Sequence, residues 1–194
     1  MAFSRLVLPT PEGPAKAEGL PLTELSLQMV RDFLAEGHRP DAILFSSDMC
    51  YRNGPLISPR HWEEFLGPCY RHIKRFADEH AIPVVSVDTD GNPDRIAPPM
   101  VRAGVNLLFP VEVAAGCDAG DWRARYPSLA LMGGIDKRSL AHGPAAIDAE
   151  LERITPALEA GRYIPDLDHL VPDDVSWQNY LYFAEALRRK VGKA

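Results

Sequence analysis

The sequence has no long hydrophobic run and no excess of positive charge. No apolar stretch approaches the roughly 18–20 residues that a membrane-spanning helix needs, and the apolar run at residues 1–9 is too short for a secretory signal. The formal net charge is -6, and no basic stripe is visible, which disfavours nucleic-acid binding. We therefore expect a cytoplasmic protein that binds neither nucleic acid nor membranes.

Cysteine is scarce, and nucleotide-binding motifs are absent. The three cysteines, Cys50, Cys69 and Cys117, are odd in number and widely spaced. They indicate reduced thiols and exclude a disulfide framework or a zinc knuckle. No G-x-G-x-x-G motif follows an apolar run and no Walker loop is present, which disfavours a nucleotide-binding sheet.

The composition is that of an ordinary globular domain. The chain has 194 residues, of which 46% are hydrophobic and 25% are charged, enough for one domain with a substantial core. Residues 8–21 are rich in proline and glycine, so we interpret residues 1–21 as a leader or loop and residues 22–194 as the domain. Helical spacing and capping signals predict helices over residues 22–34, 58–77 (kinked or broken by Pro68), 95–103, 118–125, 145–160 and 176–190.

Five apolar runs each end in an acidic residue or a histidine. They are Asp41-Ala-Ile-Leu-Phe-Ser-Ser-Asp48, Val84 to Asp90, Val105-Asn-Leu-Leu-Phe-Pro-Val-Glu112, Leu129-Ala-Leu-Met-Gly-Gly-Ile-Asp136 and Arg162-Tyr-Ile-Pro-Asp-Leu-Asp-His169. Runs of this kind that alternate with helices predict parallel strands, and the short intervals between them favour a β/α barrel.

The most informative of these runs is Val87-Asp-Thr-Asp-Gly-Asn92. If the strand continues to its end, Asp88 and Asp90 point to the same face. Like charges so close repel each other and are costly to bury, so they favour a functional role over a stabilising one. With Asp48, Glu112, Asp136 and His169 they predict a shared acidic pocket at the carboxyl ends of the strands. The alternative is that the acids are helix N-caps.

Several residues beside these acids admit two interpretations. Tyr51 and Asn53 follow Asp48 and either line the pocket or form a simple turn. Cys50 also lies just past that strand end, where we expect a bystander. Lys137 is next to Asp136 and either pairs with the acids or forms a surface ion pair, and we expect the surface ion pair.

The order of several short motifs resembles the uroporphyrinogen decarboxylase superfamily. These motifs are Asn53-Gly-Pro-Leu-Ile-Ser-Pro59, Trp62-Glu-Glu-Phe-Leu-Gly-Pro68, Val87-Asp-Thr-Asp-Gly-Asn92, Gly133-Gly-Ile-Asp136 and Tyr163-Ile-Pro-Asp-Leu-Asp-His169. The superfamily contains the decarboxylase of haem synthesis and methyltransferases that work with corrinoid proteins or methionine precursors. The likeness covers residues 25–190.

This resemblance implies an α/β fold, a partial (β/α)8 TIM-type barrel with its site at the carboxyl ends of the strands. A full barrel needs about 250 residues, so we expect about the last five β/α units here. The N-terminal half-barrel, which carries the family's substrate-gripping arginines, has no counterpart in this sequence.

The resemblance also implies a set of site residues. The expected catalytic residues are Asp48, Asp88, Asp90, Asp136 and His169, and the expected substrate-binding residues are Tyr51, Asn53 and Glu112. The family's zinc-binding His-x-Cys pair falls at Asp88-x-Asp90, and its later cysteine falls at His169. Two carboxylates and an imidazole could hold zinc or another divalent metal, but they lack the soft thiolates of the usual site.

Two functional hypotheses follow. In the first, the chain is an enzyme, either a lyase that removes carbon dioxide from a tetrapyrrole carboxylate in porphyrin metabolism, or a methyltransferase that works with a corrinoid partner protein on a small molecule. Methyl transfer is preferred, because a ring of acids repels a polycarboxylate. The alternative is an inactive fragment that completes a barrel with the missing half-barrel or as a homo-oligomer, since an open barrel exposes sheet edges.

Overall fold

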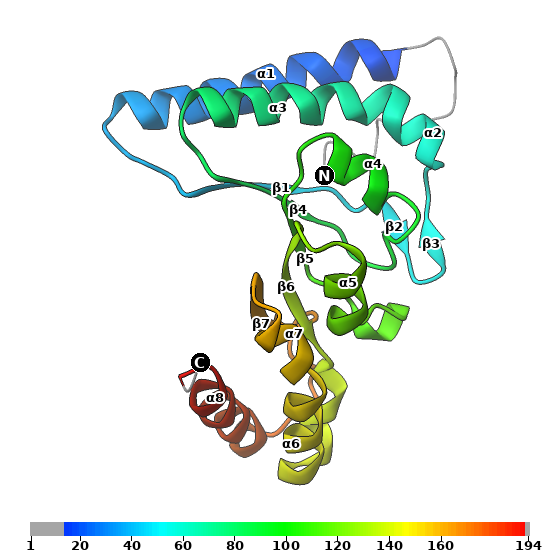
Figure 1. Ribbon diagram of the computed structural model, residues 1–194, viewed down its shortest axis with the longest axis vertical. Helices are drawn as coiled ribbons and strands as arrows, with labels where there is room; N and C mark the ends of the chain where they lie inside the picture. The colour runs from blue at the N-terminus through cyan, green and yellow to red at the C-terminus, as the bar shows by residue number, and fades with distance from the viewer. Residues whose placement is uncertain (1–13, 193–194) are drawn as a thin grey trace. The chain divides into compact units, whose positions relative to one another are not determined.

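The computed structural model describes residues 14–192 (Figure 1). The chain divides into two compact units, one up to Leu108 and one from Phe109 onward, and each is described by itself. Within the described part of the chain, no helix is both long enough and apolar enough to cross a membrane.

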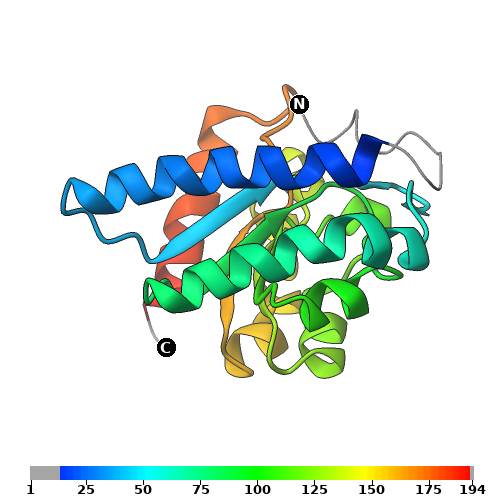
Figure 2. The ribbon, with the colours of Figure 1, turned by 90° about the horizontal axis from the view of Figure 1, so that it is seen from above.

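The first unit alternates helices with strands. Its elements are α1 (Pro14–Ala35), β1 (Ala42–Ser46), β2 (Cys50–Tyr51), β3 (Gly54–Pro55), α2 (Pro59–His61), the π-helix η2 (Trp62–Leu66), α3 (Gly67–Glu79), β4 (Val84–Asp88), α4 (Ala97–Arg102) and β5 (Leu107–Phe109), which crosses the boundary. Helices α1 and α3 lie side by side (Figures 1 and 2). Strand β1 pairs with β4 in parallel, and Ser46 is level with Asp88.

The prediction of a loop before residue 22 is wrong for residues 14–21, which belong to α1. Proline is tolerated at the start of a helix, where Pro14 lies, and the following Ala-Lys-Ala-Glu residues are good helix formers. Helix propensity therefore outweighs the glycine and proline content of this stretch. The rest of the predicted leader, residues 1–13, lies outside the described residues.

The predicted break at Pro68 is confirmed. The helix that begins after the Ser58 cap passes through five residues of π-helix, in which the Gly67 N–H donates to the Trp62 carbonyl, and α3 then starts at Gly67. Pro68 has no N–H to donate, and its ring clashes with the carbonyl four residues earlier. A wider turn just before Pro68 accommodates both effects.

Aromatic side chains fill the core of the first unit. Trp62 and Tyr70 are almost completely buried and stack with their ring centroids 5.3 Å apart. Trp62 Nε1 lies 3.1 Å from Met49 Sδ, and the Tyr70 hydroxyl donates to Ser47 Oγ over 3.4 Å. Burial raises the pKa of Tyr70 to about 12. This packing anchors the chain that leaves β1.

The second unit contains η3 (Val113–Ala115), α5 (Ala119–Arg125), β6 (Ala130–Ile135), η4 (Lys137–His142), α6 (Pro144–Arg153), α7 (Thr155–Glu159), β7 (Tyr163–Leu167) and α8 (Trp177–Val191). Strands β6 and β7 pair in parallel, and Ile135 is level with Leu167. The helix predicted over residues 145–160 is in fact two helices, α6 and α7. Pro156 lies in the first turn of α7, because its missing N–H and its ring would disrupt a continuous helix.

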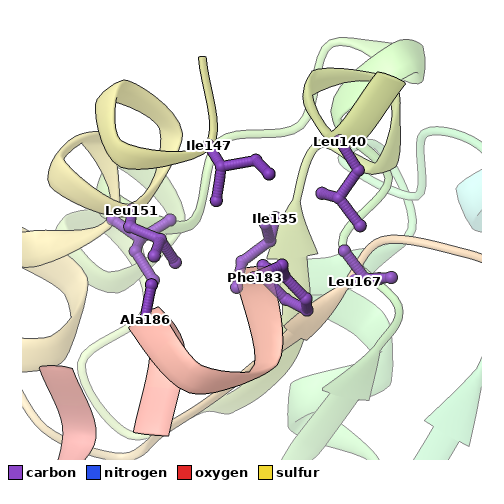
Figure 3. Close-up of a cluster of buried hydrophobic side chains, with 8 residues drawn as sticks. Ile135, Leu140, Ile147, Leu151, Leu167, Phe183 and Ala186 are labelled. Carbon is purple, nitrogen blue, oxygen red and sulfur yellow. The ribbon is translucent and has the colours of Figure 1, made fainter. Parts of the chain in front are cut away.

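One cluster of apolar side chains holds the second unit together (Figure 3). Ile135 of β6 and Leu167 of β7 meet Ile147 and Leu151 of α6, and Phe183 of α8 packs against them. The cluster therefore fixes the ends of β6 and β7 against two helices.

All five acid-ended runs contain a strand. The strand order in the sheet is β1-β4-β5-β6-β7, which is the order of the strands along the chain. Consecutive parallel strands joined by helices are the repeating units of a β/α barrel. The predicted fold class, a partial barrel of β/α units, is confirmed.

We expect Leu151→Ala to lower the free energy of unfolding by about 2–4 kcal/mol, because the change leaves a cavity in the core. Leu151 is 4% exposed in α6, whereas Leu181 in α8 is 49% exposed. Leu181→Ala is thus the matched control, with an expected effect within about 0.5 kcal/mol. Urea unfolding of both variants measures the difference, and equal losses would contradict the position of this core.

Candidate functional site

In the first unit, the carboxyl ends of β1 and β4 lie side by side. Ser46 Oγ donates to Asp88 Oδ2 over 3.3 Å, and the Ser47 N–H donates to the Asp88 carbonyl over 2.8 Å. Strand β4 ends at Asp88, so the alternation expected for Asp88 and Asp90 does not extend to Asp90. Both carboxylates are partly buried, and Thr89 between them is buried.

The hairpin β2–β3 is fastened to the loop that follows β4. Thr89 Oγ1 accepts from the Met49 N–H over 3.1 Å, and the Asn92 N–H donates to the Tyr51 carbonyl over 3.1 Å. Gly91 has φ +77°, and a Cβ there would lie 2.6 Å from the Tyr51 carbonyl oxygen. Only glycine fits this close approach. The Val-Asp-Thr-Asp-Gly-Asn segment therefore has a structural role, because it holds the β2–β3 hairpin in position.

The first strand-end group comprises Asp48, Cys50, Tyr51, Asn53, Asp88 and Asp90. Asp48 and Asn53 are exposed, and Tyr51 is 70% exposed, so all three are available to a ligand. Cys50 is 6% exposed. Burial raises the pKa of its thiol to about 11, with a further increase from the charge of Asp48 and a decrease from a hydrogen bond with Thr89. Cys50 is therefore a protonated, buried thiol, which fits the expected bystander.

The second unit has a different centre, the carboxylate of Asp168. This side chain is completely buried directly after β7. Its Oδ2 accepts from the Val113 N–H over 2.9 Å, and its Oδ1 accepts from the Lys137 N–H over 3.1 Å. One carboxylate thus fixes the segments that follow both β5 and β6.

Lys137 completes this arrangement with its ammonium group. Its Nζ lies 3.5 Å from Asp168 Oδ1 and 3.9 Å from Glu112 Oε1, and its side chain is only 16% exposed. The expected surface ion pair is wrong, and the alternative, pairing with the strand-end acids, is found, because η4 directs Lys137 toward the buried Asp168. A carboxylate without access to water needs such a partner, since its isolated charge would be very costly to bury.

Asp136 is a helix N-cap, which was the alternative to a pocket residue. It precedes η4, and its Oδ1 accepts from the Arg138 N–H over 3.0 Å. The Arg138 guanidinium binds both carboxylate oxygens, at 2.8 Å and 2.6 Å. Burial raises the pKa of Asp136, but the hydrogen bonds and positive charge of Arg138 outweigh this, so the pKa is lowered overall. Its catalytic role stays a prediction.

A second network of hydrogen bonds and ion pairs holds the carboxyl end of β6. Arg153 Nη2 donates to the Gly134 carbonyl and to Glu150 Oε1, both over 2.6 Å. Nη1 of the same guanidinium forms an ion pair with Asp118. The hydrogen bond with Glu150 is the main cause that raises the pKa of Arg153. Glu150 Oε1 also accepts from the Asp136 N–H over 2.6 Å. Helix α6 therefore sets the position of the strand end.

His169 follows Asp168 and is exposed. Its Nδ1 accepts from the Leu170 N–H over 2.8 Å, which in the neutral ring places the proton on Nε2. The predicted metal ligands Asp88 and Asp90 belong to the first unit and His169 to the second. Among the residues that the structure describes, no three histidine, cysteine or acidic side chains are grouped to hold a metal ion.

The structure thus places Asp48, Tyr51, Asn53, Asp88 and Asp90 at the ends of β1 and β4 and in the hairpin between them. Glu112, Asp136 and His169 follow the ends of β5, β6 and β7. The second strand-end group comprises these last three with Lys137 and Asp168. Sequence reasoning passed over Asp168, although Asp166-Leu-Asp168 repeats the spacing of Asp88-Thr-Asp90. Applied to both pairs, the same signal would have found it.

Parallel β/α units with acidic carboxyl ends define the class, an α/β protein of the barrel type. Residues 21–190 match the family described as uroporphyrinogen decarboxylase (URO-D), and the chain belongs to this family, as predicted. No curated protein matches the chain.

Among solved structures, the chain is similar to a methyltransferase from Methanosarcina mazei, with 23% identity and a TM-score of 0.53. The likeness covers 77% of this chain but only 42% of that one. At this identity it shows a shared fold. The chain therefore spans less than half the length of this neighbour.

We expect Asp168→Asn to lower the free energy of unfolding by about 2–4 kcal/mol. The amide keeps one acceptor oxygen, but its NH2 group faces a backbone N–H, and Lys137 loses a counter-charge. Asp174 is exposed, so Asp174→Asn is the control and should have no measurable effect. Urea unfolding decides, and an unchanged Asp168→Asn midpoint would contradict the proposed role of this carboxylate.

Alkaline pH provides a test of the buried Cys50. Its folded-state pKa of about 11 lies above the ordinary value of 9.0, so folding favours the neutral thiol. This contribution is complete below pH 9 and is lost as the pH rises toward 11, by about 1–3 kcal/mol. Cys50→Ala should therefore lose less stability than the wild type between these pH values, as measured by urea unfolding. Equal losses of stability in the wild type and in Cys50→Ala would mean that the thiol is not buried.

Proposed function

We propose that this chain acts in corrinoid-linked methyl transfer to or from a small molecule. One observation carries the proposal, namely that the ammonium of Lys137 is already shared by Glu112 and Asp168. The name of the Methanosarcina mazei methyltransferase, whose fold the chain shares, supports the same reading.

The charges of the second strand-end group argue against a polycarboxylate substrate. Lys137 has two carboxylates within 4.0 Å, and Arg138 is bound by Asp136 on both oxygens. A tetrapyrrole that carries several carboxylates needs cations that are not already neutralised, because like charges repel at short range. Tetrapyrrole decarboxylation is therefore the second candidate, supported by the family assignment alone.

The residues of the chain have distinct roles in this proposal. The first strand-end group offers the carboxylates of Asp88 and Asp90 as proton acceptors for a hydroxyl or thiol group of the substrate. The exposed ring of Tyr51 provides an apolar contact surface beside them. His169 offers its Nε2–H as a donor, and Asp168 keeps the neighbouring loops in position. A bound corrinoid would supply the methyl group or accept it.

A second role is proposed for the case in which the chain has no activity of its own. The chain matches only 42% of its structural neighbour, which favours a partner polypeptide that contributes further β/α units. In this case the function belongs to the completed barrel. Activity of the purified chain alone would exclude this role.

The test uses free methylcobalamin as the probe, with a small thiol as the methyl acceptor. We expect the purified chain to accelerate loss of the cobalt-bound methyl group, followed by visible absorbance, and to release no carbon dioxide from uroporphyrinogen. Release of carbon dioxide without methyl transfer would establish the decarboxylase reading. Absence of both activities would favour the inactive fragment.

Asp88→Asn should reduce methyl transfer by about 100-fold, a typical contribution of a positioned proton acceptor. Asp78→Asn is the matched control, because Asp78 lies in α3 with a 62% exposed side chain. It should leave the rate unchanged. An Asp88→Asn variant that is folded and fully active would remove Asp88 from the site.

A further inference from the structure

Val111 has a backbone conformation that its residue type disfavours. Its φ is +54°, in the left-handed region, where a β-branched residue is strained. Among the residues that the structure describes, two other non-glycine residues have positive φ, Ala81 and Arg162, and both are exposed. Val111, in contrast, is 3% exposed. A strained residue persists only where its surroundings fix it, and such residues cluster at functional sites.

Hydrogen bonds on both sides of Val111 hold it in this conformation. The Pro110 carbonyl accepts from the Gly134 N–H over 3.0 Å. The Val113 N–H donates to Oδ2 of the buried Asp168 over 2.9 Å. These two bonds join the segment to β6 and to the end of β7. Relaxation of the backbone between them would therefore distort or break one of them.

The residue that this strained backbone presents is Glu112. Its carbonyl accepts from the N–H groups of Ala115 and Cys117 over 3.1 Å and 3.2 Å, so its backbone is fixed as well. Although Glu112 is the N-cap residue of η3, its side chain makes no capping hydrogen bond. Its Oε1 lies 3.9 Å from Lys137 Nζ. The carboxylate is thus directed toward Lys137 and not toward the helix that follows.

Lys137 has two carboxylate partners that differ in accessibility. Asp168, whose Oδ1 is 3.5 Å from the ammonium, has no exposed side-chain surface, whereas the side chain of Glu112 is 21% exposed. One ammonium between two carboxylates leaves an excess of negative charge. Solvent reaches this group through Glu112 and Lys137. A ligand carboxylate that approaches Lys137 is therefore repelled by Glu112.

We propose that Glu112 determines substrate specificity by keeping Lys137 neutralised, and that the strained Val111 is its positioning residue. The inference rests on the proposed function, which requires a site that refuses polycarboxylates. Without the charge of Glu112, Lys137 has only the buried Asp168 as a counter-charge, and its ammonium is available to a ligand carboxylate. The substrate class that fits the native site is a neutral or cationic small molecule.

The test is the binding of uroporphyrin, a porphyrin polycarboxylate, to the purified full chain, followed by porphyrin fluorescence. Glu112→Gln should bind uroporphyrin about 10-fold more tightly than the wild type, because a like charge at close range is removed. Glu152→Gln is the matched control, since Glu152 pairs with Lys190 over 3.0 Å and its side chain is 77% exposed. It removes the same charge and should leave the Kd within about 2-fold of the wild type, because solvent screens exposed charges.

A second substitution locates the gain in affinity at Lys137. Adding Lys137→Gln to Glu112→Gln should abolish the gain, and circular dichroism should show that both variants are folded. An unchanged affinity of Glu112→Gln, or an equal gain from Glu152→Gln, would overturn the proposal. So would a gain that survives Lys137→Gln.

Val111→Gly tests the positioning role. Glycine samples a wider range of φ than valine, so Glu112 is no longer held toward Lys137, and the affinity for uroporphyrin should rise toward that of Glu112→Gln. Adding Glu112→Gln should then give no further gain, because both changes act through one carboxylate. If Val111→Gly leaves the affinity at the wild-type value, Val111 does not position Glu112.

Val105→Gly is the matched control for this variant. Val105 is also 3% exposed and lies outside the helices and strands, but its φ is not positive. It should leave the affinity unchanged. Both glycine variants lose a buried side chain, but only Val111→Gly also relieves strain, so its urea midpoint should fall less. A larger fall for Val111→Gly would contradict the strain.

The binding assay needs no turnover, so it separates this inference from the proposed function. A chain that transfers methyl groups but binds uroporphyrin as tightly as its Glu112→Gln variant would overturn the inference alone. A chain that gains affinity on Glu112→Gln but transfers no methyl groups would overturn the proposed function alone. In that case Glu112 still selects the ligands of the site, and the reaction is a different one.

Discussion

The second unit depends on one buried carboxylate. Asp168 is completely inaccessible to solvent and binds two backbone N–H groups, at Val113 and Lys137, together with the Lys137 ammonium. Buried without partners, this charge would destabilise the fold, and with them it ties together the chain segments that follow three strands. The positions of Glu112, Asp136 and His169 follow from this constraint, because each lies within one residue of a segment that Asp168 holds or belongs to.

The first unit holds the segments after its strands together without a buried charge. Here Thr89 and Gly91 bind the hairpin to the loop after β4 through one hydroxyl and one close backbone approach. Asp88 also accepts from Ser46 across the two strand ends. In the second unit, Asp168 and Asp136 have clear structural tasks, as a buried anchor for two loops and as a helix N-cap.

Local signals predicted the secondary structure well. The Ser58 cap of α2, the break at Pro68 and the five apolar runs all depend on chemistry within a few residues, and the structure has each of them. The start of α1 was placed too late, because glycine and proline content was given more weight than the helix formers between them. The helix break at Pro156 was missed, because the regular apolar spacing around it was given more weight than the proline.

By itself the sequence determined the family, the β/α order and the positions of acids at strand ends, because motif order and hydrophobic periodicity are properties of the linear chain. Tertiary structure alone decided which of these acids hold the fold together. Asp166 and Asp168 repeat the spacing of Asp88 and Asp90, yet Asp168 is buried and bound to Lys137, a residue 31 positions away. Burial and charge pairing between distant segments arise only when the strands pack side by side, and no local pattern contains that information.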